Sequence, residues 1–123
     1  ALRTSFEASE WAARQPHEVE VPFDTVIGGV VVRGRIDAVF REAGGGDLLW
    51  TVVDWKTGAK PTGAAADAAA IQLAAYRLAW ADLQGIEPDQ VAAAFHYVRS
   101  GDTVRITEPL SAADLAALLR VHA

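Results

Sequence analysis

The first half of the chain alternates between apolar and polar residues with the period of a β-strand. Residues 18–27 and 30–41 both show this alternation, and Gly28–Gly29 between them is typical of a hairpin turn. Pro22 has no backbone donor, so the first strand is expected near an edge of the sheet. One face of that strand is predicted to carry Val19, Val21, Phe23 and Thr25.

The second and third strands complete a predicted meander. On the second strand, the even-numbered residues from Val30 to Phe40 are expected on one face and the odd-numbered residues from Val31 to Val39 on the other. The turn AGGGD follows at 43–47. Residues 48–55 are almost wholly apolar, which is typical of a central strand covered on both faces.

The second half mixes helical and extended patterns. Residues 66–84 predict a long alanine-rich helix that ends at Gly85. Strands are expected over 91–99 and 103–107, and Ser111 is predicted to cap a last helix with Asp114 in the capping-box position. A short amphipathic helix is expected over residues 4–14.

This order of elements predicts an α/β fold. A central mixed β-sheet, made of a three-strand meander plus two further strands, is flanked by helices. The 123 residues are expected to form one domain, residues 1–123.

Composition narrows the function classes. At 51% hydrophobic residues the chain can build a core, and no apolar run approaches the ~20 residues that span a bilayer. The absence of cysteine excludes thiolate zinc sites, cysteine-ligated iron–sulfur clusters and a cysteine nucleophile. With no visible secretory signal, a cytoplasmic location is expected.

The formal net charge of −5 is unusual for a free-standing domain that grips DNA by its phosphates. If the chain handles DNA, we expect another part of a larger protein to deliver the strand. The abrupt ends of the sequence agree with a fragment of such a protein. Arg33, Arg35, Lys56 and Lys60 are candidates for a local basic patch.

Candidate chemistry gathers where the apolar third strand ends. Asp54 and Lys56 share one face of this strand because side chains alternate with period two. Asp37 lies on the neighbouring strand, about 4.8 Å away if the two pair as a meander. A carboxylate at the end of a buried strand needs a cation or several donors. The pattern predicts that Asp37 and Asp54 share one metal ion.

Two carboxylates, a backbone carbonyl and waters make a hard oxygen shell, which favours Mg²⁺ or Mn²⁺ over zinc. Lys56 beside such a site would orient or deprotonate a water and offset charge on a phosphate. Asp37, Asp54 and Lys56 are therefore the candidate catalytic residues for metal-dependent phosphodiester hydrolysis.

Simpler interpretations stay open for each residue. An Asp-x-Lys on a strand is most often a surface ion pair, and Asp37 alone would suit a salt bridge with Arg35. The combination with the buried strand favours the functional interpretation.

Other residues are candidates for supporting roles. Gln72 and Tyr76 share a face of the long helix; either the glutamine faces water while the tyrosine packs on the sheet, or both contact the substrate. Glu20 is either a carboxylate behind the metal ligands or an ordinary edge charge. Trp55 is expected to point away from Asp54 and to clamp the sheet to a helix.

These motifs resemble the PD-(D/E)XK nuclease superfamily in its RecB-like form. The family pattern G-x-x-D, D-x-K-T-G and Q-x-x-x-Y corresponds to Gly34–Asp37, Asp54–Gly58 and Gln72–Tyr76. An E-x-x-F element corresponds to Glu20–Phe23. The resemblance covers roughly residues 5–99 and implies a restriction-endonuclease-like core.

The resemblance also implies roles. Asp37 and Asp54 would bind the metal with the backbone carbonyl of Trp55, Lys56 would be the catalytic lysine, and Gln72 and Tyr76 would line the channel for the DNA strand. The module would act beside UvrD-like helicase motor domains, and possibly a second subunit, in break-repair machines of the RecB, AddAB or AdnAB type.

One feature departs from the family pattern. The metal-binding histidine that RecB-like enzymes carry upstream has no counterpart in this chain, since neither His17 nor His96 is in the right place. Weak metal binding or poor cleavage by the isolated chain is therefore an open expectation.

Two alternatives to an active nuclease remain. The chain could be a nuclease-fold module that has lost catalysis and serves in DNA binding or structure. It could also be a plain interaction domain, which predicts that Asp37 and Asp54 lie far apart.

Overall fold

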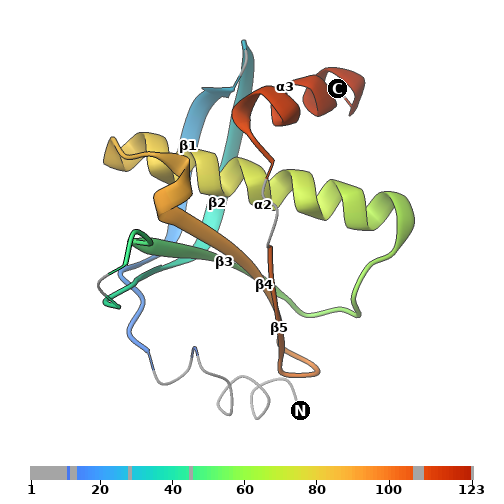
Figure 1. Cartoon of the computed structure of the whole chain (residues 1–123). Coiled ribbons are helices and arrows are strands. Elements are labelled where there is room, and N and C mark those ends of the chain that lie inside the picture. Colours follow the sequence, from blue (N-terminus) through green and yellow to red (C-terminus); the bar gives the residue numbers. More distant parts are fainter. Residues whose placement is uncertain (1–10, 12–13, 28, 45, 107–109, 123) are drawn as a thin grey trace.

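The fold is a five-stranded sheet with the long helix α2 across one face and α3 at one end of that helix layer (Figure 1). A computed structural model of the chain describes residues 11, 14–27, 29–44, 46–106 and 110–122, with backbone only for 119–122. The elements are β1 Glu18–Ile27, β2 Val30–Arg41, β3 Trp50–Lys56, α2 Gly63–Gln84, the 3₁₀ turn η1 Pro88–Gln90, β4 Val91–Tyr97, β5 Asp102–Arg105 and α3 Ala112–His122.

The strands lie in the order β1-β2-β3-β4-β5. The first three form an antiparallel meander, β4 runs parallel to β3 after the crossover through α2, and β5 is antiparallel to β4. The predicted mixed α/β sheet is confirmed. Pro22 lies in the edge strand β1, as expected.

Element boundaries differ from the predictions by a few residues. The third strand begins at Trp50 rather than at residue 48, and α2 begins three residues earlier than predicted. The fourth strand ends at Tyr97, because the Gly101 amide closes a turn onto the Tyr97 carbonyl at 2.8 Å. Most of the helix predicted over 4–14 lies outside the described residues.

Both helix-end predictions in the second half are confirmed. Gly85 adopts the left-handed conformation (φ 66°) after α2, and the Ile86 amide reaches back to the Ala81 carbonyl at 3.0 Å. At the start of α3, the Ser111 hydroxyl accepts a hydrogen bond of 3.1 Å from the Asp114 amide. Within the described residues, no helix is both long and apolar enough to cross a bilayer.

The core lies on both faces of the sheet. The main cluster fills the space between the sheet and α2 and includes Ile36, Val39, Val52, Leu73, Trp80 and Phe95. A second cluster joins α3 to α2 and the end of β1 through Ile27, Leu78 and Leu115. On the opposite face, Trp11 covers Ala38, Phe40, Val53 and Ala94.

The predicted alternation on β1 and β2 is wrong at one point. Ile36 packs on the α2 side, whereas Ala38 packs under Trp11 on the other side. On β1, Val21 is buried but Val19 is 58% exposed, so these two residues also point to opposite faces.

The cause lies at Glu20, whose φ is +50°. The register keeps the same offset on both sides of this residue, with Val19 opposite Ala38 and Val21 opposite Ile36. Both strands therefore change face together at the position where Glu20 lies across from Asp37. A non-glycine residue in this conformation costs about 1–2 kcal/mol, and such strain concentrates near functional sites.

Candidate active site

Asp37 and Asp54 meet at the end of the β2–β3 ladder. Ala38 pairs with Val53, so the next position along the register places Asp37 opposite Asp54. The Trp55 backbone N–H donates a 2.9 Å hydrogen bond to Asp37 Oδ2. A carboxylate thus takes the place of a strand carbonyl, and the ladder ends where the two acids come together. This proximity contradicts the prediction of the plain interaction domain.

Lys56 completes the cluster. Its Nζ lies 3.0 Å from Asp54 Oδ2, with the aspartate side chain 6% exposed and the lysine side chain 31% exposed. The contact is an ion pair without a directed hydrogen bond, since Asp54 Oδ2 has no hydrogen-bond partner within the described residues. Lys56 Nζ also lies 5.9 Å from the centre of the Phe95 ring. The ammonium group therefore stands at the boundary between the buried carboxylate and solvent.

Burial first, and then the neighbouring Asp37 carboxyl group, raise the pKa of Asp54 from 3.8 to about 6. The Lys56 ammonium opposes this shift but does not cancel it. The ionised carboxylate is thus held in an environment that has too little positive charge near it.

This charge deficit is what a divalent cation would relieve. Asp54 Oδ2 is a buried acceptor without a directed donor, and Asp37 offers a second carboxylate beside it. In the described parts of the chain, no third acidic, histidine or cysteine side chain joins this pair. The donor set of two carboxylates, with water and backbone oxygen to complete the shell, suits Mg²⁺ or Mn²⁺.

Tyr76 of α2 is buried between this helix and the sheet, whereas Gln72 does not pack. The Tyr76 side chain is 7% exposed and its pKa is raised to about 12, first by burial and then by the negative charges of Asp54 and Asp37. The phenol stays protonated and can act as a donor. Gln72, one turn earlier, is exposed to solvent. The structure therefore packs Tyr76, but not Gln72, against the sheet that carries Asp37 and Asp54.

Glu20 is exposed on the edge strand and lies opposite Asp37 in the β1–β2 register. It shares the strained backbone at this position. The β1–β2 pairing therefore brings Glu20 next to the site, and within the described residues no hydrogen bond joins its side chain to the carboxylates.

The predicted basic patch is largely neutralised by ion pairs. Arg33 pairs with Asp24 across the hairpin at 2.9 Å, and Lys60 pairs with Asp102 at 3.0 Å. Lys56 is engaged by Asp54. Three of the four cations thus have acidic partners, which sequence alone did not reveal because two of these partners come from other elements.

Trp55 lies on the face opposite Asp54, as expected, but it does not clamp the sheet to α2. Its ring lies edge to face with the rings of Trp11, Phe40 and His96, at centroid distances of 6.4, 6.2 and 5.8 Å. The clamp to a helix stays a prediction, because Trp11 belongs to the helix predicted over 4–14 and most of that segment lies outside the described residues. His96 is fully buried, in agreement with a core role.

Two buried residues were not singled out in advance. Phe95 is paired with Asp54 in the parallel ladder, so the two share a face. Arg77, next to Tyr76, is 4% exposed and donates a 2.7 Å hydrogen bond to the Val91 carbonyl, which ties α2 to the start of β4. Burial lowers the pKa of Arg77. The alternation of side chains along residues 95–97 could have placed Phe95 on the same face of the sheet as Asp54.

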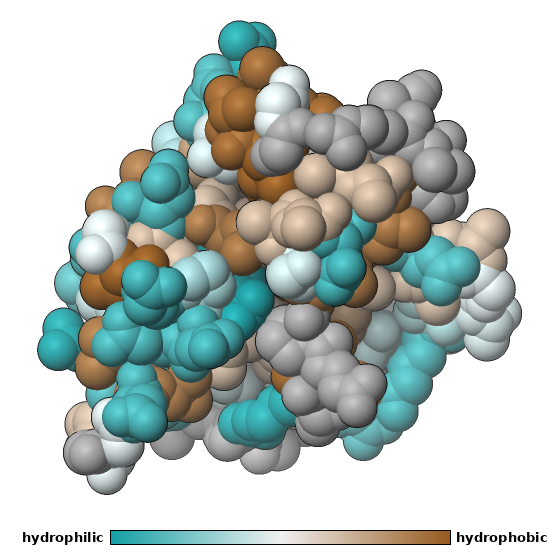
Figure 2. Space-filling model, turned by 45° about the horizontal axis from the view of Figure 1, so that its top comes forward, coloured by the Kyte–Doolittle hydropathy of each residue, from teal (hydrophilic) through white to brown (hydrophobic). Residues whose placement is uncertain are grey.

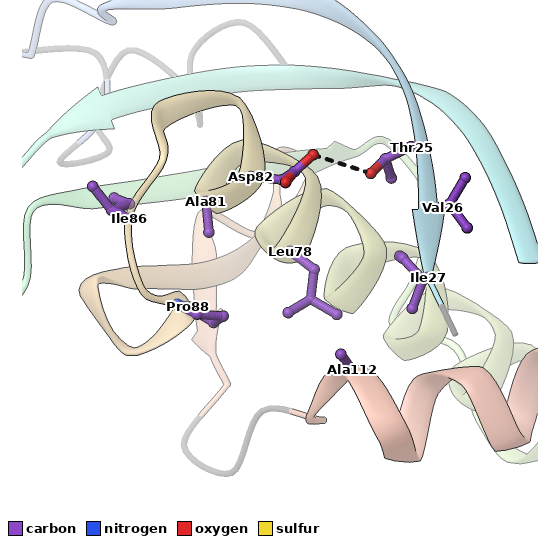
Figure 3. Close-up of a pocket in the computed structure, with 9 residues that line it drawn as sticks. All are labelled: Thr25, Val26, Ile27, Leu78, Ala81, Asp82, Ile86, Pro88 and Ala112. Carbon is purple, nitrogen blue, oxygen red and sulfur yellow. Dashed lines mark hydrogen bonds between the residues drawn. The ribbon is translucent and has the colours of Figure 1, made fainter. Parts of the chain in front are cut away.

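A pocket of about 270 Å³ lies elsewhere, between the end of β1, the second half of α2 and the start of α3 (Figure 3). Most of the lining side chains drawn in Figure 3 are apolar. Among them, the Thr25 hydroxyl donates a 3.4 Å hydrogen bond to Asp82. Apolar and small residues also gather over the upper and middle part of the face in Figure 2. None of the carboxylates or the lysine of the cluster lines this pocket, so it is not the candidate site.

The raised pKa of Asp54 predicts how stability depends on pH in the presence of a chelator. The folded state holds the Asp54 proton more tightly than the unfolded state, so this residue's contribution to the free energy of unfolding is lost as pH rises from about 4 to about 6. Asp54→Asn should therefore exceed wild type in stability at pH 7, by at most about 3 kcal/mol, and match it near pH 4. Urea unfolding across this pH range measures the difference.

Asp47→Asn is the control, because Asp47 is exposed in the β2–β3 turn. It should follow the wild-type pH profile. A wild-type advantage over Asp54→Asn that grows between pH 4 and 6 would contradict the buried, cation-poor carboxylate.

No curated protein matches the chain. Among solved structures, the crystal structure of SSO0001 superposes with a TM-score of 0.52 at 23% sequence identity, over 84% of this chain and 47% of that chain. At this identity the similarity speaks for the fold alone, and the chain spans about half the length of that protein.

The sequence profile of one family matches almost the whole chain, over residues 1–122. The profile is that of the PD-(D/E)XK nuclease superfamily. With a meander that leads into a mixed sheet, the α/β fold is of the restriction-endonuclease-like kind. The chain belongs to the PD-(D/E)XK nuclease superfamily.

Proposed function

We propose that the chain hydrolyses phosphodiester bonds of DNA with the help of Mg²⁺ or Mn²⁺. The observation that carries this proposal is the convergence of Asp37 and Asp54 from adjacent strands, with Lys56 Nζ 3.0 Å from Asp54 Oδ2. Membership of a superfamily whose enzymes are generally divalent-metal nucleases supports it. A nuclease fold also implies DNA as the binding partner.

In this proposal Asp37, Asp54 and the Trp55 carbonyl hold the ion. A bound divalent ion supplies a more acidic water and neutralises charge on the phosphate. The side chains of the chain do the rest. Either the Lys56 ammonium orients the attacking water and offsets the charge of the phosphate as the P–O bond to the leaving oxygen breaks, or the neutral Lys56 amine takes the proton of that water. Tyr76 and Gln72 contact the backbone of the bound strand.

Lys56 suits this role because of its position. Its ammonium is next to the carboxylates but is 31% exposed, so it can reach a phosphate from solvent. Arg33 and Lys60 of the predicted basic patch are paired with acidic side chains. Together with the net charge of −5, this supports delivery of the strand by another part of a larger assembly.

We therefore place the chain, as part of the same proposal, in a RecB-like helicase–nuclease that processes broken DNA. Cleavage by the complete protein should increase with ATP, because an ATP-driven motor would feed DNA to a site that attracts it weakly. The rate of release of labelled nucleotides with ATP and with a non-hydrolysable analogue measures this dependence. Equal rates in both conditions would remove the motor from the proposal while leaving the nuclease intact.

Replacing Lys56 or Asp54 should strongly reduce DNA cleavage without unfolding the protein. Lys56→Ala and Asp54→Ala are expected to lower the rate of DNA hydrolysis by about 10²- to 10⁴-fold, since each removes a group that acts on the reacting atoms. A gel assay with a radiolabelled strand and Mn²⁺ measures the rate, and thermal unfolding checks the fold.

Lys60→Ala is the matched control. Lys60 is a nearby lysine that is half exposed and paired with Asp102 outside the cluster. It should retain cleavage within a few-fold of wild type. Wild-type rates in both Lys56→Ala and Asp54→Ala would refute the assignment of the site.

The alternative is a nuclease-fold module that binds DNA or supports a complex without cutting. Metal binding separates it from an enzyme. For the active nuclease we expect Mn²⁺ at millimolar concentration to raise the melting temperature of wild type, because a ligand that binds only the folded state stabilises it by RT ln(1 + [L]/Kd). Asp37→Ala should remove this increase, and Asp47→Ala should keep it.

No increase for wild type at millimolar Mn²⁺ would favour the inactive module. An increase that survives in Asp37→Ala would place the ion elsewhere and contradict the proposed ligands.

A further inference from the structure

The packing at Gly34, three residues before Asp37 on β2, is unusually close. A Cβ atom at this position would lie 3.0 Å from both Cε1 and Cζ of Phe23 and 3.5 Å from Cε1 of Tyr76. The shorter distances are below ordinary van der Waals contact, and the strand register places Phe23 directly opposite Gly34. The ring of Phe23 covers the bare backbone of the neighbouring strand.

Backbone conformation does not require glycine here. The glycines with positive φ in the described residues are Gly29, Gly63, Gly85 and Gly101, and Gly34 is not among them. Glycine within a strand often marks a close approach of another group. At Gly34 the approaching groups are the rings of Phe23 and Tyr76, so the missing side chain makes room for them.

The two rings fix one another. Phe23 and Tyr76 meet edge to face at 5.6 Å between centroids with an interplanar angle of 78°, and each side chain is 7% exposed. Tyr76 therefore has packed neighbours on β1 and β2 as well as on its own helix. Burial, and then the negative charges of Asp54 and Asp37, raise the pKa of Tyr76.

We infer that Gly34 and Phe23 are positioning residues, which seat the Tyr76 ring beside the paired carboxylates of β2 and β3. This seat, formed by Gly34 and Phe23, acts on the site through Tyr76 and through strand β2, which also carries Asp37. The inference rests on the proposed function for its effect on cleavage, but the seating itself can be measured without any cleavage.

The seat is also connected to Asp37 through strand β2. Gly34 belongs to the same strand as Asp37, so a shift of β2 needed to relieve a clash at Gly34 would move the carboxylate as well. A displacement of about 1 Å in an active site can lower a rate by about 100-fold. A residue without a side chain at position 34 is therefore needed for the packing and also for the position of Asp37.

Fluorine NMR of protein that carries 3-fluorotyrosine tests the seat. The Tyr76 resonance is assigned by its loss in Tyr76→Phe. In Gly34→Ala this resonance should move by more than its linewidth, because the added methyl displaces the Phe23 and Tyr76 rings. Asp54→Asn should shift the resonance in the wild-type background and shift it less in the Gly34→Ala background, where the phenol has moved from the carboxylates.

A compensating variant makes the test specific. Phe23→Leu removes the two ring atoms that the new methyl would meet, so Gly34→Ala combined with Phe23→Leu should return the Tyr76 resonance toward its wild-type position. Cleavage should follow: kcat/KM for a DNA strand with Mn²⁺ is expected to fall roughly 10- to 100-fold in Gly34→Ala and to recover most of this loss in the double variant.

Gly44→Ala is the matched control, because a Cβ at Gly44 meets nothing within 4 Å. It should leave the resonance and kcat/KM unchanged. The inference is overturned if Gly34→Ala leaves the Tyr76 resonance in place, or if Phe23→Leu fails to restore it in a double variant that folds. Absence of cleavage in wild type with the resonance responses as expected would instead refute the proposed function and retain the seat.

Discussion

Two like charges held side by side at the end of a buried strand set the conditions for the rest of this structure. Asp54 stands on β3 after an apolar run, and Asp37 faces it from β2. Their repulsion is tolerated because the Trp55 amide donates to Asp37, the Lys56 ammonium lies beside Asp54, and the Asp54 proton is retained to an unusually high pH. The arrangement destabilises the protein at neutral pH, because the ionised Asp54 carboxylate is buried with too little positive charge near it.

Neighbouring elements are arranged around this pair. The change of face at Glu20 and Asp37 lets β2 contribute Ile36 to the α2 side and Ala38 to the Trp11 side within three residues. The helix α2 supplies Tyr76 over one side, and β4 supplies Phe95 beneath Lys56. The site is thus assembled from strands and a helix rather than from loops, which holds the carboxylates in a fixed relation.

Sequence reasoning reached the fold and the principal cluster because both depend on short-range periodicity. An apolar strand that ends in Asp54 and Lys56 must bring those residues to the surface together, and a meander must place Asp37 on the adjacent strand. It failed where the two-residue alternation of the strands was interrupted, and it assigned Val19 and Ala38 to the wrong faces. The interruption lies at Glu20, which has a positive φ although it is not a glycine, so no residue type in the sequence indicated it. It also missed pairings such as Lys60 with Asp102, which join residues far apart in sequence.

The positions of Gly34, Asp37, Asp54, Lys56 and Tyr76 have an evolutionary consequence. All five lie on β2, β3 and α2, which follow one another without interruption by any other helix or strand of the described chain. A contiguous segment of this kind can be inherited whole, while β5, α3 and the tip of the β1–β2 hairpin diverge around it. Related proteins should therefore differ most in these peripheral pieces, where new attachments to other domains can be added without rebuilding the chemistry.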